Sequence, residues 1–348
     1  MAYSSVGTPR IYVNWLEWLY NTKSFTNDSF VSWGNVDSLE YSFTQSSYIQ
    51  KSFPAGDFAT SGISWIYGTN TYNFHNKLNF FMLLNHNFKD KYNLRLQCYN
   101  QTSGSGGTNW ISFIDDVNDG NNDIYGGNVV GDEIQDIQNK PIIFTWNPLS
   151  SLGTRSDIRV DIFTISGSNF SSTDTIDFSS AMFGRYYDFE HGSQLPSSLG
   201  ISYEGIDTTT TQGGHTISNM RYSGKPSNPF SYKEDENTVS STTYAESGRK
   251  SWTLNFKFMT NSKILPTNFN DIANIVADDY LDEYYSENEN FFSTVLNKTM
   301  GSHIPFVFQP NNTDFNDMYI CRFDQNDFNF EEVAPGIYDM TLKIIETW

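Results

Sequence analysis

Histidine is the commonest catalytic and zinc-binding side chain, and the histidines of this chain are scattered. None forms a His-Glu-x-x-His pair or lies at metal-binding distance in sequence from a cysteine; they are His75, His86, His191, His215 and His303. No Gly-x-Ser-x-Gly elbow, Gly-x-x-x-x-Gly-Lys-Ser/Thr loop or Gly-x-Gly-x-x-Gly fingerprint is present. The glycine-rich stretch at 104–107 has no nearby lysine and predicts a hairpin loop. We therefore predict no catalytic residue, no cofactor and no enzyme activity.

Acidic and amide residues gather in one stretch with the order DDVNDGNND, residues 115–123. The EF-hand spacing fails, because with Gly120 in the sixth position the third and twelfth residues are not ligands. Asp, Asn and Gly are also the residues that a tight surface loop uses. No metal site is therefore expected, and this stretch is a weak calcium candidate through the carboxylates of Asp115, Asp116, Asp119 and Asp123.

A glycoside hydrolase needs two carboxylates about 5–9.5 Å apart that flank the scissile bond. The chain has 40 acidic residues, and no local motif singles out such a pair. The densest cluster, at 278–289, is most simply the solvated face of a helix. Glycan hydrolysis is thus the weakest function considered.

The charge balance excludes two further classes of partner. With 21 basic and 40 acidic residues the formal net charge is −19, and the pI is about 4.5. Binding to nucleic acid or to anionic lipid needs a concentrated basic surface. Neither partner is expected, and the chain has no apolar run long enough to insert into a membrane. Cys98 and Cys321 allow one bridge at most, and two buried thiols are the simpler expectation.

The chain's aromatic content and period-2 patterning predict a mainly β fold. Its 28 Phe, 21 Tyr and 8 Trp residues suit half-buried, pleated surfaces. The clearest alternation lies at 248–259, where Trp252, Leu254, Phe256 and Phe258 alternate with polar residues. We expect a β-sandwich or barrel with strands at 63–67, 78–84, 92–99, 110–114, 141–146, 158–165, 248–259, 304–308, 319–323 and 337–345.

One region departs from the strand pattern. Apolar residues recur at helical spacing across 268–285, and a second short helix is expected over 290–299. The fold would thus carry a short helical insertion near 268–299. We expect an N-terminal β domain at 1–180, a polar loop or arm region at 181–247, and a C-terminal β segment at 248–348 that packs on the N-terminal domain.

Long segments near the two ends carry a family resemblance. They read GTPRIYV (7–13), GRKSWTLNF (248–256), NKTMGSHIPFVFQP (297–310), YICRF (319–323) and YDMTLKIIE (338–346). In type and order they resemble virion structural proteins of tailed bacteriophages of the marine type, particularly distal-tail and baseplate subunits. Ser302 stands where the family pattern has a second glycine, and the middle of the chain matches weakly.

The resemblance implies a non-enzymatic subunit of a distal-tail, baseplate or tail-adaptor ring. Its partners would be further copies of itself, with a hexamer among the options, and neighbouring tail proteins. It would be found in the virion, assembled in the host cytoplasm. The polar stretch 184–233 would be an arm between subunits that orders on assembly. The expected interface residues are Arg185, Tyr186, Tyr187, Arg221 and Tyr222.

Other functions stay open at this point. The main alternative is a carbohydrate- or receptor-binding β-sandwich of the virion, which clustered exposed Trp and Tyr would favour. A capsid-surface (cement) protein is a further option, because virion β-sandwiches look alike from sequence. In any assembly, copies that each carry −19 repel one another, so association must rely on apolar contact, basic partners or cations.

Overall fold

The computed structural model describes part of the chain. Backbone and side chains are described over most of 7–18, 79–84, 143–145, 180–203, 207–218, 248–265, 290–314 and 317–347. Further strands are described by their backbone alone, at 32–33, 51–54, 63–68, 92–100, 110–114, 155–164 and 175–178.

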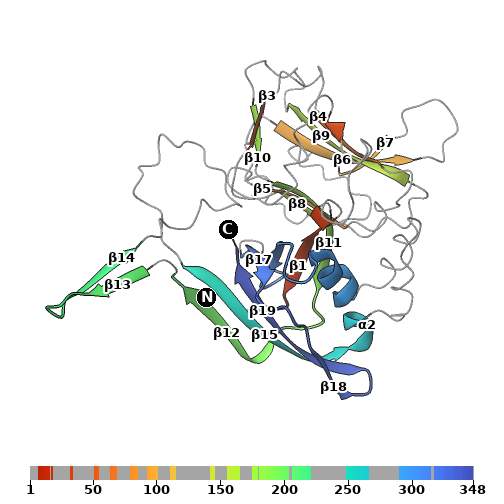
Figure 1. Cartoon of the computed structure of the whole chain (residues 1–348). Coiled ribbons are helices and arrows are strands. Elements are labelled where there is room, and N and C mark those ends of the chain that lie inside the picture. The colour runs from red at the N-terminus through yellow and green to blue at the C-terminus, as the bar shows by residue number, and fades with distance from the viewer. Residues whose placement is uncertain are drawn as a thin grey trace.

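A large antiparallel sheet forms the body of the molecule (Figure 1). Ten strands of the described residues belong to it, in the order β12-β15-β19-β17-β16-β1-β11-β5-β8, with β18 paired to β19. Their bounds are β1 Arg10–Asn14, β5 Phe80–Leu84, β8 Ile142–Thr145, β11 Ser180–Asp188, β12 Gln194–Ser202, β15 Arg249–Thr260, β16 Phe306–Gln309, β17 Tyr319–Phe323, β18 Phe330–Ala334 and β19 Ile337–Glu346.

Three smaller sheets accompany the large one. A five-stranded sheet has the order β2-β4-β9-β6-β7, and two pairs are formed by β10 with β3 and by β13 with β14. These strands are β2 Ser32–Trp33, β3 Lys51–Pro54, β4 Ile63–Gly68, β6 Tyr92–Asn100, β7 Trp110–Ile114, β9 Arg155–Thr164, β10 Thr175–Phe178, β13 Ile206–Thr210 and β14 Thr216–Met220.

The mainly β prediction is confirmed, and the predicted strands are found close to their expected bounds. The barrel alternative does not describe the large sheet, because its order begins at β12 and ends at β8 without pairing those two strands. Strands of this sheet come from all three predicted segments, 1–180, 181–247 and 248–348. The proposed boundaries at 180 and 248 stay a prediction.

Alternation along β15 and β19 builds one core face of this sheet. Trp252 pairs with Ile344 and Phe256 pairs with Met340, and all four side chains are buried. Cross-strand neighbours on one face lie close enough to pack, which explains the burial. The alternation of buried and exposed side chains breaks at Phe258. This residue was expected to be buried but is 66% exposed, with a positive φ of 61°. The register shifts between Phe256 and Met259, so a bulge turns the next apolar side chain inward.

Helical structure is confined to short pieces in the described residues. The helix expected at 290–299 is found as a π-helical turn, η7 (Phe292–Leu296), followed by α3 (Asn297–Thr299). The Asn290 side chain caps its start by accepting a hydrogen bond from the Ser293 N–H at 2.7 Å. A further turn, α2 (Asn261–Ile264), follows β15. The helix expected at 268–285 lies outside the described residues.

Gly184 provides a test of how tightly the centre of the sheet is packed. It lies on β11 between β1 and β5, where an added Cβ would overlap the backbone oxygen of Val13 and approach the Phe80 ring at 3.1 Å. We predict that Gly184→Ala lowers the free energy of unfolding by about 3 kcal/mol or more, because backbone must move to admit the methyl group. Denaturant unfolding measures this loss.

Gly213 supplies the matched control. The nearest atom to a Cβ at Gly213 is a His215 ring carbon at 3.7 Å, an ordinary contact. Gly213→Ala should therefore unfold close to wild type. Equal stability of the two variants would contradict the predicted packing around β11.

Candidate functional site

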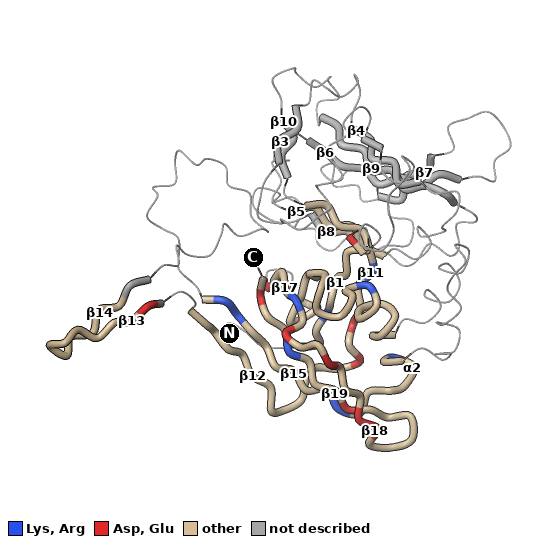
Figure 2. Tube along the Cα trace, in the orientation of Figure 1, with Lys and Arg blue, Asp and Glu red and all other residues tan. Residues whose placement is uncertain are grey.

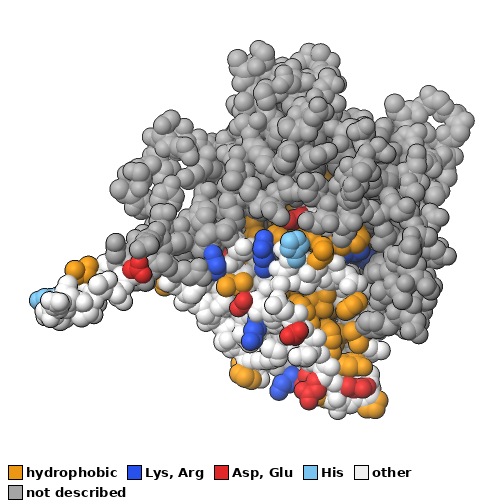
Figure 3. All heavy atoms as spheres, in the orientation of Figure 1, with side chains coloured by type: hydrophobic (Ala, Val, Ile, Leu, Met, Phe, Trp, Pro, Cys, Tyr) orange, Lys and Arg blue, Asp and Glu red, His pale blue; other side chains and the backbone are white. Residues whose placement is uncertain are grey.

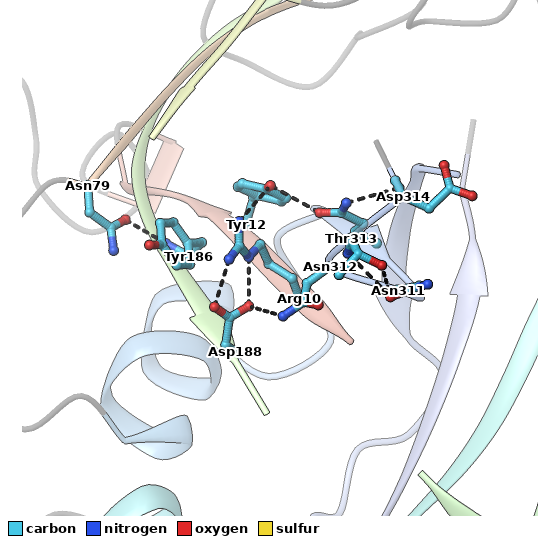
Figure 4. A network of polar contacts seen from close by, with 10 residues as sticks. Arg10, Tyr12, Asn79, Tyr186, Asp188, Asn311, Asn312, Thr313 and Asp314 are labelled. Atoms are coloured by element: carbon cyan, nitrogen blue, oxygen red, sulfur yellow. Dashed lines mark hydrogen bonds and ion pairs between the residues drawn. The ribbon is translucent and has the colours of Figure 1, made fainter. Parts of the chain in front are cut away.

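A polar network fastens strand β1 to its two neighbours (Figure 4). Arg10 donates from Nε and Nη2 to the two carboxylate oxygens of Asp188 at 2.6 and 2.7 Å. Its guanidinium also lies 4.1 Å from the ring centroid of Tyr186. On the other side, the Tyr12 hydroxyl donates to Gln309 at 3.1 Å, and burial raises the pKa of Tyr12 to about 12. These groups satisfy one another, so the network is structural.

The predicted interface residues of β11 are part of this framework. Arg185 and Tyr187 are each 4% exposed, and Tyr186 is half-buried. Tyr187 donates its hydroxyl to the Lys263 carbonyl at 3.0 Å and packs its ring edge-on to Phe189. The structure therefore places these side chains within the chain's own sheet, and their role between subunits stays a prediction. Arg221 and Tyr222 lie outside the described residues.

Metal binding finds no support in the part of the chain that the structure describes. Asp115, Asp116, Asp119 and Asp123 lie outside it, so the calcium candidate stays a prediction. Among the described residues, no group of three or more His, Cys, Asp or Glu side chains could hold a metal ion. Cys321 is a buried thiol in β17.

The segment after β1 carries a buried carboxylate, and a buried amine from α3 packs on two of its tryptophans. Glu17 is 3% exposed and Lys298 is 1% exposed. The Lys298 amine lies 3.5 Å from the ring centroid of Trp18 and 4.9 Å from that of Trp15, a cation–π arrangement. Burial raises the pKa of Glu17 to about 8, although the positive charge of Arg322 opposes that shift. Sequence reasoning missed this group, because no local pattern marks a glutamate as buried.

A polar cavity of about 560 Å³ opens between β15, β19 and the 324–329 loop. Its walls carry the carboxylates of Asp324, Asp327, Glu331 and Asp339, several amides and two lysines. The aromatic residue in its lining, Phe256, is fully buried and offers no ring face. The cavity can donate and accept hydrogen bonds, but it has no aromatic platform for a sugar.

The most distinctive surface lies along β12, at one end of the large sheet. Leu199 is 38% exposed and Ile201 55%, and these alternate residues lie on one face of β12. Tyr203, the first residue past the end of the strand, is 50% exposed. Leu199 pairs with the buried Trp252, so this is the core face of the sheet, carried onto an uncovered edge strand. No described strand pairs with the outer side of β12. We refer to Leu199, Ile201 and Tyr203 as the β12 stripe.

The hairpin formed by β13 and β14 follows β12 and stands away from the body (Figures 1 and 3). Its turn is closed by the Thr211 N–H donating to the His215 carbonyl at 2.8 Å and by Gly214 at a φ of +80°. A three-residue loop ending in a left-handed glycine is a common hairpin turn. All side chains described between 207 and 218 are exposed, including Ile217 at 58%.

The β12 stripe and the hairpin share a second property, the near absence of charge. Strand β12 (QLPSSLGIS) has no charged residue, and Asp207 is the one acid within the hairpin. Figure 2 shows this stretch free of blue and almost free of red. Five of the eight exposed large hydrophobic residues in the described part of the chain lie between 195 and 217. An uncharged apolar edge marks a place where another chain can approach.

Comparisons with known proteins leave the identity of the chain open. No family model and no curated protein matches it. One solved structure, of reduced XRCC1 bound to the DNA polymerase β catalytic domain, matches 37% of this chain and 75% of its own at 10% identity. The TM-score is 0.22, so that likeness carries no argument about fold or function. No helix among the described residues is long and apolar enough to cross a membrane.

The raised pKa of Glu17 predicts a pH-dependent stability. The pKa of this carboxyl group is about 8 in the folded chain, against an ordinary value of 4.5. Its contribution to the free energy of unfolding is therefore complete below pH 4.5 and is lost as the pH rises to 8. The free energy of unfolding of Glu17→Gln should therefore rise relative to that of wild type between pH 4.5 and pH 8, by up to about 1.4 kcal/mol per pH unit. Urea unfolding from pH 5 to pH 8 measures the difference.

Glu331→Gln is the control, because it removes the same charge from an exposed side chain. A Glu17→Gln curve that runs parallel to wild type at every pH would contradict a buried carboxyl with a raised pKa.

Proposed function

We propose that this chain is a structural subunit of a phage tail, of the distal-tail, baseplate or tail-adaptor ring type. It would act by assembling with copies of itself and by docking neighbouring tail proteins. The observation that carries the assembly part is the uncharged, apolar edge at β12 in a chain of net charge −19. Such an edge promotes association unless a partner covers it.

The placement of the resembling segments supports the same proposal. The five segments lie on β1, β15, β16, β17 and β19, which form consecutive strands in the order β15-β19-β17-β16-β1. Residues far apart in the sequence thus form one continuous half of the sheet. A resemblance confined to scattered loops would carry less weight, because the strands of one sheet share a packing constraint.

A carbohydrate- or receptor-binding module is the second candidate. The observation in its favour is the polar cavity beside β15 and β19, with its amides, carboxylates and lysines. Its lack of an exposed aromatic ring counts against sugar stacking. Retention of the chain on a glycan array, lost on Asp339→Ala, would favour this candidate over the tail subunit.

The charge of the chain predicts how assembly depends on salt. Because each copy carries −19, repulsion between copies opposes a ring at low ionic strength. We expect the mass from light scattering to rise between about 20 mM and about 300 mM NaCl, as the screening length shortens. Negative-stain images of the heavier species should show closed rings.

A calcium series at matched ionic strength separates screening from cation binding. Equal masses in sodium and calcium salts support screening alone, whereas heavier species in calcium implicate bound cations. A monomer throughout, with no binding to other tail proteins, would overturn the proposed function.

A further inference from the structure

The β13–β14 hairpin has the form of an arm, and no other described strand supports it. It is a sheet of two strands, with the pairing Thr208–Ser218 and Thr209–Ile217 near its middle. No described strand pairs with either of its outer sides. An isolated two-stranded hairpin is marginally stable in water, and a third strand or a packing surface is needed to hold it. Its β-branched residues favour the extended conformation, but the side chains described between 207 and 218 are exposed.

The β12 stripe is the complementary surface. It offers a strand edge with which no described strand pairs, beside the apolar side chains of Leu199, Ile201 and Tyr203. Its own hairpin begins at Ile206, after only three residues beyond the end of β12, and extends away from the sheet (Figure 1). The hairpin therefore does not reach back along β12 of its own molecule, so it is not the occupant of that edge.

Charge identifies a second copy of this chain as that occupant. A basic partner would be recognised by acidic residues, yet β12 has no charged residue and the hairpin has a single acid. Copies of a chain with a net charge of −19 can approach most closely where both surfaces are uncharged. The arm and the edge both meet that condition. The arm can supply a strand to the open edge, and the edge can supply a packing surface to the arm.

We propose that the β13–β14 hairpin of one copy adds to the β12 edge of the next, with Ile217 packed on the β12 stripe. The backbone of the arm supplies hydrogen bonds to the open edge, as in other cases of strand addition. Because the arm and the edge are different surfaces, the contact is head-to-tail and generates a ring or an open filament. This inference rests on the proposed function, since it names the contact by which the subunit assembles.

Two charge substitutions test the contact, one on each side. Ile201→Lys blocks the edge and Ile217→Lys blocks the arm, and both replace side chains that are more than half exposed. Each variant alone should be a monomer of 39.8 kDa by light scattering, under salt conditions where wild type assembles. The matched control is Val333→Lys, which adds the same charge at a 44% exposed residue on β18 and should assemble like wild type.

Mixing the two blocked variants gives the sharper result. The Ile201→Lys copy keeps its arm and the Ile217→Lys copy keeps its edge, so one contact can form and no further growth is possible. The mixture should give a 1:1 complex of about twice the 39.8 kDa monomer mass, although neither variant associates alone. Mass tagging of one variant shows that the complex contains one copy of each.

Other outcomes overturn the inference and separate it from the proposed function. Dimers of Ile217→Lys alone would mean that edges pair with edges. Full assembly of both variants would reject this contact while leaving a ring subunit in place. A wild type that stays monomeric at every salt concentration would reject the contact, and it would also remove the proposed function if the chain bound no other tail protein. Circular dichroism and thermal unfolding of each variant confirm that loss of assembly is not loss of fold.

Discussion

Strand β1 holds the large sheet together, because it pairs with β16 on one side and with β11 on the other. Without it, the half built from β15, β19, β17 and β16 has no connection through the sheet to β11, β5 and β8. The paired carboxylate and guanidinium of Asp188 and Arg10 lie directly opposite each other and set the register. Gly184 lets β1 approach β11 closely, since any side chain there would meet the Val13 backbone.

Sequence patterning predicts those strands whose two faces differ. Along β19 the buried Met340, Leu342 and Ile344 alternate with exposed Thr341 and Lys343, and the strand was predicted within two residues of its ends. Central β11 has buried residues on both faces, so its sequence does not alternate between apolar and polar residues. For this reason Gly184 to Asp188 were predicted to belong to the polar arm. Arg185 and Tyr187 were expected at an interface because they are embedded in a polar stretch. Their burial depends on strands that are distant in sequence. The bulge after Phe256 likewise could not be predicted, because the apolar and polar residues continue to alternate through Phe258 in the sequence.

The candidate site was less accessible to sequence reasoning than the fold. An arm within 181–247 was expected, but the edge beside it emerges only from the pairing of β12 with the distant β15. Whether Leu199 or Ile201 is exposed depends on which strand lies outside β12, and no local spacing carries that information. The same applies to Glu17, which is 3% exposed and has a raised pKa although no local spacing marks it as buried.

Comparison of two outer strands shows why β12 is a docking edge and not merely an unprotected one. Strand β18 also lies at the outside of the sheet, and it carries exposed Glu331 and Glu332. Charges of this kind prevent edge-to-edge association, and they are the usual protection of an open strand. Strand β12 has no such charge although the chain has 40 acidic residues. Acids are therefore abundant in the chain, yet β12, an outer strand of the described sheet whose apolar core face is exposed, carries none. This is the pattern expected of a surface that another copy covers.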